Sequence, residues 1–78
     1  MATNVAPGRL ERQVERQLQA LLREFEGEIP PGEVTPIVEA HFARLREQAR
    51  IEEFIPVLVY RYAREELRIR REELHHAA

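Results

Sequence analysis

The sequence predicts an all-α fold, a three-helix bundle that forms a dimer, and three observations support this prediction. All 12 basic residues are arginine and all 14 acidic residues are glutamate, and both are good helix formers, whereas aspartate prefers caps and turns. Apolar residues recur at helical spacing through three segments. A chain of 78 residues without cysteine has a small core and no disulfide, so association is the expected source of further stability.

A first helix is predicted over residues 9–26, after a flexible N-terminus at 1–8. Its apolar residues fall within about a third of the helix circumference, as in a helix with one buried face. Gly27 follows, and glycine commonly ends helices in a left-handed conformation. The run EGEIPPGE then predicts a loop, because its prolines and glycines cannot continue a helix. The apolar stripe consists of Leu10, Val14, Leu18, Leu21, Leu22 and Phe25.

A second helix is predicted over residues 33–49, with two possible starts. Thr35 and Pro36 read as an N-cap followed by the first helical position, where proline is tolerated. Alternatively the helix starts near Gly32, and Pro36 is strained within its first turn. The sequence leaves this choice open. The apolar stripe, which also contains His41, consists of Val34, Ile37, Val38, Phe42, Leu45 and Ala49.

A third helix is predicted over residues 52–73, after a break near 49–51 and before a frayed C-terminus at 74–78. The run FIPVLVY carries no charge and is apolar nearly all round the helix. A helix with two apolar sides must be covered on both, and an uncovered stripe normally marks an interface. The predicted interface residues are His41, Phe54, Ile55, Val57, Leu58, Tyr60 and Tyr62.

The residue types argue against an enzyme and against a cofactor or metal site. Cysteine, serine and aspartate are absent, so neither a nucleophile with an adjacent base nor a set of zinc ligands is available. His41 is the only internal histidine. A lone histidine on an apolar stripe is most often a packed, hydrogen-bonded residue, and we interpret His41 in this way.

The charge pattern disfavours nucleic-acid and membrane partners. The net charge is −2, whereas binders of polyanions need a dominant basic field. No apolar run approaches the roughly 20 residues of a membrane span, and the N-terminus lacks the pattern of a signal peptide, so we expect a cytoplasmic protein.

One helix face of the third segment carries Arg61, Arg64, Arg68 and Arg71. Such a face is typical of an anion-binding stripe. However, the pairs Arg61–Glu65, Glu66–Arg70 and Arg68–Glu72 have i,i+4 spacing, which favours a solvated face of ion pairs. Whether this face binds an anion stays open at this point.

The runs FEGEIPPGEV and ARIEEFIPVLVYRYAREELR resemble an actinobacterial family of small three-helix bundle dimerization domains. The pattern comprises Glu24-Phe25-Glu26-Gly27, Val34, Ala49-Arg50, Phe54, Pro56, Val57, Leu58, Arg61, Arg64 and Arg68. The resemblance covers about residues 10–70 and implies self-association without catalysis. Members occur alone or attached to arsenate-reductase or phosphatase-like domains. Pro36 departs from the pattern, within the expected second helix.

We therefore expect a non-catalytic protein–protein interaction module that mediates homodimerization through its apolar third helix. One alternative is a small nucleic-acid-associated regulator, because the second and third helices loosely resemble a helix-turn-helix. Another is an adaptor that docks on a separate enzyme through the same apolar surface. The sequence does not identify such a heterologous partner or a pathway.

Overall fold

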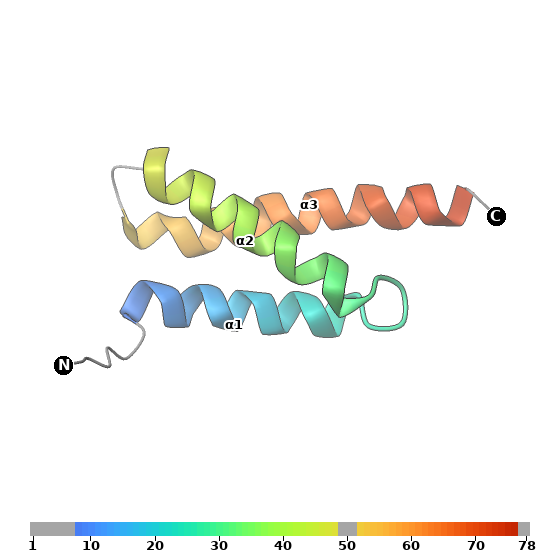
Figure 1. The fold of residues 1–78 in the computed structure, drawn as a ribbon, viewed down its shortest axis with the longest axis horizontal. Helices are drawn as coiled ribbons and strands as arrows, with labels where there is room; N and C mark the ends of the chain where they lie inside the picture. Colours follow the sequence, from blue (N-terminus) through green and yellow to red (C-terminus); the bar gives the residue numbers. More distant parts are fainter. Residues whose placement is uncertain (1–7, 49–51, 77–78) are drawn as a thin grey trace.

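The computed structural model describes residues 8–48 and 52–76, and this part of the chain is almost entirely helical. It contains α1 (Arg9–Glu24), α2 (Pro31–Gln48), a short 3₁₀ turn η1 (Glu52–Phe54) and α3 (Ile55–His76). The helices α1 and α3 run side by side in the same direction, and α2 returns across both (Figure 1). The predicted all-α three-helix bundle is thus confirmed for the described residues.

The core lies where the three helices meet. From α3 it takes Ile55, Val59, Ala63 and Leu67, which are spaced four residues apart and therefore line one side of the helix. The remaining buried apolar side chains come from α1, the α1–α2 loop and α2, and they are Val14, Leu21, Phe25, Ile29, Val34, Val38 and Leu45. Among the described residues, no polar or charged residue is buried.

The loop after α1 has the predicted glycine geometry. Helix α1 ends at Glu24, two residues before the predicted end. The carbonyl of Phe25 then accepts hydrogen bonds from the N–H groups of Glu28 (2.9 Å) and Ile29 (3.0 Å). Gly27 has a φ of +83°, a left-handed conformation that L-residues adopt only at a cost. The tight turn also brings Ile29 into the core.

Replacement of Gly27 by alanine is expected to destabilise the chain by about 1 kcal/mol, because the residue keeps a positive φ. A Cβ at Gly27 would meet no atom within 4 Å, so the loss would come from the backbone alone. Gly32→Ala is the matched control, since Gly32 is helical and its Cβ would also be unobstructed. The control is expected to stabilise by about 0.5–1 kcal/mol. Urea unfolding measures both, and equal effects would contradict the left-handed turn.

Helix α2 begins at Pro31, within one residue of the start near Gly32 that the sequence allowed as an alternative. The carbonyl of Pro30 accepts the N–H groups of Glu33 and Val34 at 2.9 and 3.2 Å, and Pro31 occupies the first position, where its missing N–H costs nothing. Thr35 therefore does not cap the helix. Pro36 is its sixth residue, beyond the first turn.

The ends of α3 also differ from the prediction. Residues 52–54 form η1, so that α3 starts at Ile55 with Pro56 in its first turn, the position that suits proline. The helix continues to His76, although residues 74–78 were expected to fray. Its last turns project beyond the α1–α2 loop (Figure 1). Residues 1–7 of the predicted flexible N-terminus (1–8), the predicted break at 49–51 and residues 77–78 lie outside the described part of the chain.

Candidate interaction surface on the third helix

The large apolar side chains that the described residues leave exposed all lie on η1 and α3. Their exposed fractions are 56% for Phe54, 61% for Val57, 41% for Tyr62, 50% for Ile69 and 45% for Leu74. No described helix is long and apolar enough to cross a bilayer. Leu74 lies two turns after buried Leu67 and so continues the core side of α3, and Tyr62 lies on the flank beside α2. The candidate surface is the outer side of η1 and α3, with Phe54 and Val57, together with this flank.

The structure divides the predicted interface residues into three groups. Phe54, Val57 and Tyr62 are exposed, as an interface between copies requires. Leu58 and Tyr60 are half-buried and pack against the core. Ile55 is only 1% exposed and belongs to the core cluster, so in the single chain its side chain is not accessible to a partner. Half-buried His41, on α2, lies beside Tyr62.

His41 links α2 to α3 through a small polar cluster. Its Nε2 lies 2.8 Å from Oε1 of Glu66, and Nη2 of Arg44 lies 2.6 Å from its Nδ1. A guanidinium can only donate, so Nδ1 must accept and Nε2–H must donate to the Glu66 carboxylate. The guanidinium of Arg44 also lies 5.6 Å from the centre of the Tyr62 ring. His41 is thus a packed, hydrogen-bonded residue, in agreement with its interpretation from the sequence.

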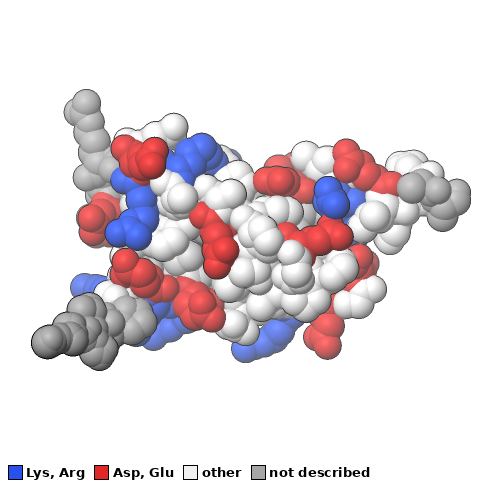
Figure 2. Space-filling view, viewed as in Figure 1, with Lys and Arg blue, Asp and Glu red and all other residues white. Residues whose placement is uncertain are grey.

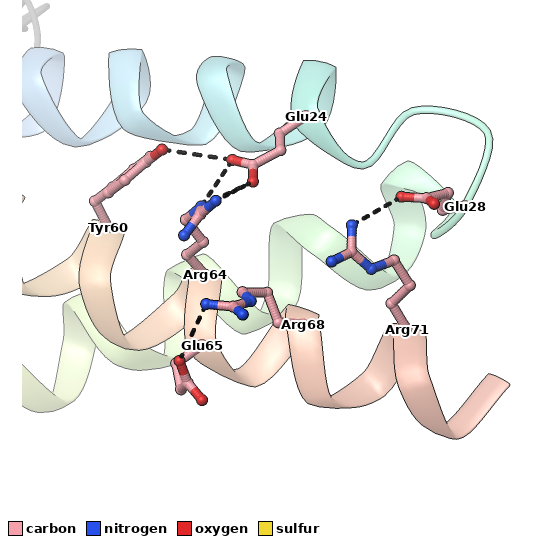
Figure 3. A network of polar contacts seen from close by, with 7 residues as sticks. All are labelled: Glu24, Glu28, Tyr60, Arg64, Glu65, Arg68 and Arg71. Atoms are coloured by element: carbon pink, nitrogen blue, oxygen red, sulfur yellow. Dashed lines mark hydrogen bonds and ion pairs between the residues drawn. The ribbon is translucent and has the colours of Figure 1, made fainter. Parts of the chain in front are cut away.

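The four arginines of the predicted arginine face do not form one continuous basic surface. Arg64 donates from Nε to both carboxylate oxygens of Glu24 at 3.0 and 2.8 Å, and its Nη2 is 2.7 Å from Glu24 (Figure 3). Arg71 donates to Glu28 at 3.2 Å, and its guanidinium lies 5.2 Å from the centre of the Phe25 ring. These two arginines link α3 to α1 and to the α1–α2 loop. Their guanidinium groups are therefore already paired with glutamates of the same chain.

The contact between Arg64 and Glu24 joins α3 to the last residue of α1 and shifts the pKa of the carboxyl group. The Arg64 hydrogen bonds lower the pKa of Glu24 and outweigh the opposing effect of its partial burial, and Tyr60 adds a weaker hydrogen bond at 3.4 Å. Charge-assisted bidentate pairs of this kind fix geometry as well as adding energy. The buried line of Ile55, Val59, Ala63 and Leu67 turns one side of α3 to the core, and the Arg64–Glu24 contact ties the flank of that side to α1.

None of the predicted i,i+4 ion pairs is formed among the described residues. Glu66 contacts His41, and Arg70 donates to Glu33 of α2 at 2.8 Å. Arg68 instead reaches Glu65 by an i,i+3 contact of 4.0 Å, at the limit for an ion pair. The helix therefore uses its flanking charges to bind its neighbours, while an outer ridge of Arg61, Glu65, Arg68 and Glu72 faces away from them.

No group of three histidine, cysteine, aspartate or glutamate side chains among the described residues could hold a metal ion. Figure 2 shows arginine and glutamate side chains interspersed around a mostly uncharged centre on the face that α2 crosses. Neither sign of charge dominates that face.

Comparisons with protein-family models, with curated proteins and with solved structures found no match to this chain. Its function must therefore be inferred from the geometry of its surface.

Proposed function

We propose that this chain is a non-catalytic interaction module that forms a homodimer through the outer side of α3. The observation that carries this proposal is the exposure of Phe54 and Val57, each by more than half of its surface. They are the most exposed of the large apolar side chains among the described residues. Contiguous exposed apolar surface of this kind usually marks a site of protein association.

The two side chains lie close together at the start of α3. Phe54 ends η1 and Val57 lies three residues later in the first turn of α3, a spacing that places them on neighbouring positions of a helical surface. Half-buried Leu58 follows Val57 and packs against the core. Removing apolar surface from water contributes about 25 cal/mol per Å² before the costs of association. Association would therefore add to the stability that the small core of the single chain supplies.

Two features favour a second copy of the chain over other partners. The outer ridge carries two arginines and two glutamates, so that it has no net charge to repel a copy of itself. The resemblance to dimerization domains implies the same partner. A nucleic acid would require an excess of basic charge, and the exposed residues at the start of α3 are apolar. An adaptor for a separate enzyme would use the same surface. Its complex would differ from the homodimer in mass, because it would contain the enzyme in place of a second copy of the chain.

The first experiment is the solution mass of the chain, by light scattering on a size-exclusion column across a dilution series. A homodimer would have twice the chain mass of 9.2 kDa, and its dissociation constant would follow from the dilution. A monomer at all concentrations would contradict the proposal. Salt-dependent binding to a short DNA duplex, measured on the same sample, would favour the nucleic-acid alternative instead.

The substitution Val57→Glu is expected to weaken the homodimer at least tenfold, because it buries a charge in the interface, while the chain stays folded. Val57 is 61% exposed, so its replacement leaves the core intact; half-buried Leu58 would be a poorer choice. Ala43→Glu, at an exposed position of α2, adds the same charge elsewhere and serves as the control. Equal dissociation constants for the two variants would rule out the outer side of α3 as the interface.

A further inference from the structure

We infer that the two copies pack their α3 helices antiparallel, with Arg61 of one chain opposite Glu72 of the partner subunit and Glu65 opposite Arg68 of the partner subunit. This inference rests on the proposed homodimer and adds to it the orientation of the partner. It is carried by the charge sequence of the outer ridge, by the length of α3 and by the position of two exposed apolar side chains.

The outer ridge alternates in sign along the helix. Arg61, Glu65, Arg68 and Glu72 are separated by four, three and four residues, so they fall within roughly 60° of one another at about 100° per residue. All four are exposed. In the part of the chain that the structure describes, the side chains of Arg61 and Glu72 form no ion pair, and Arg68 and Glu65 make only the contact at 4.0 Å. These charges are thus available to a partner.

The two orientations of a symmetric helix pair differ in which charges meet. In a parallel pair in register, each residue meets its own copy, so arginine would face arginine and glutamate would face glutamate. In an antiparallel pair with its dyad between Glu66 and Leu67, every ridge residue faces the opposite charge. Like charges across an interface are unfavourable and opposite charges select orientation.

The same dyad lies near the middle of α3, which runs from Ile55 to His76. An antiparallel pair about this point overlaps along nearly the whole helix. The last turns of α3, which project beyond the α1–α2 loop (Figure 1), would then lie beside the start of the partner's helix. There they would cover the exposed Val57, which comes opposite the last residue of the partner's α3, whereas Phe54 would lie just beyond the end of that helix.

Apolar side chains also match across this dyad. Tyr62 and Ile69 are 41% and 50% exposed and lie on the same flank of α3, since their spacing of seven residues is two turns. Their midpoint is within one residue of the ridge's midpoint, so each would come opposite the other in the antiparallel pair. Exposed ion pairs are worth at most about 1 kcal/mol each. The charges would therefore set the direction, and the apolar contacts would supply most of the affinity.

Cross-linking tests the orientation directly, because the chain has no cysteine of its own. The double variant R61C/E72C would be treated with a short bismaleimide, and the linked peptides would be identified by mass spectrometry. Positions 61 and 72 of one chain lie about 16 Å apart along the helix at ~1.5 Å per residue, too far for a short link within the chain. We expect a covalent dimer linked 61 to 72, and no covalent dimer from R61C or E72C alone.

Each other result has a distinct meaning when the mass of the untreated variants is measured first. Covalent dimers linked 61 to 61 would show a parallel pair and would overturn this inference, although the homodimer would stand. A dimeric mass without 61–72 links would also overturn it. A monomeric mass for the unmodified chain would instead refute the proposed function itself.

Charge reversal gives an independent readout. R61E and E72R are each expected to raise the dissociation constant about threefold to tenfold, because opposite charges become like charges across the dyad. The double variant R61E/E72R restores opposite charges and should return the constant close to that of the unmodified chain. If the double variant is weaker than both single variants, Arg61 and Glu72 do not face each other and the antiparallel register is wrong.

Discussion

Phe25→Ala is expected to destabilise the chain by about 3–5 kcal/mol, the range for truncating a buried aromatic side chain. Phe25 is completely buried and follows the last residue of α1. Its ring packs in the core, and Arg71 of α3 covers it at 5.2 Å. At about 0.05–0.15 kcal/mol per residue, a chain of this size has only about 4–12 kcal/mol of stability. The variant should therefore lose between about a quarter and all of this stability, and unfold at a clearly lower urea concentration.

Circular dichroism at 222 nm with urea titration measures this loss. Leu22→Ala is the matched control, because Leu22 lies on the same helix but is only half-buried, and it should cost clearly less. All variants are compared at one chain concentration, since association adds stability that depends on concentration. A urea midpoint for Phe25→Ala equal to that of the control would mean that Phe25 does not pack in the core as described.

The fold class could be predicted because the helical period and the breaks in the sequence agree with each other. The stripe from Leu10 to Phe25 has one apolar face, and it became the core side of α1. Gly27 ended this segment through the left-handed conformation that glycine adopts most easily. Tertiary packing did not need to override these local preferences, which is why the sequence alone was sufficient here.

The sequence did not show in the same way which side of α3 faces the core and which side faces outward. Its start is apolar nearly all round, so Ile55 and Val57 looked equally suited to an interface. The core took Ile55 with Val59 and Ala63 because α1 and α2 approach α3 on that side. Where two helices meet a third depends on contacts between distant segments, and the local period of α3 does not contain this information.

Ion pairs were mispredicted for a related reason. The spacing of arginine and glutamate on α3 suggested pairs along one helix, but Arg64 bonds to Glu24, 40 residues away in the sequence. A partner on a neighbouring helix can be partly shielded from water, which strengthens the pair relative to an exposed one. Only the packing of the helices shows which glutamates lie close enough to each arginine.

Self-association through α3 stays a prediction, because the structure describes a single chain.

Pro36→Ala is expected to stabilise the chain by about 1–3 kcal/mol, because proline in a helix interior costs about 3 kcal/mol relative to alanine. Pro36 is the sixth residue of α2, so it removes the N–H that would otherwise donate to the carbonyl of Gly32. Part of the gain is offset, since proline also restricts the unfolded chain by up to about 1 kcal/mol. Pro36 is exposed, so its replacement by alanine disturbs no core contact.

Thermal unfolding followed by circular dichroism measures this gain, at roughly 4–8 °C per kcal/mol for a domain of this size. Pro31→Ala is the control, because Pro31 occupies the first helical position, where its missing N–H has no partner to lose. The control should leave the midpoint nearly unchanged. If Pro36→Ala behaves like the control, then Pro36 itself occupies a first turn and α2 begins near Thr35. A large gain confined to Pro36 would instead place the helix start at Pro31, with the proline retained at a measurable cost in stability.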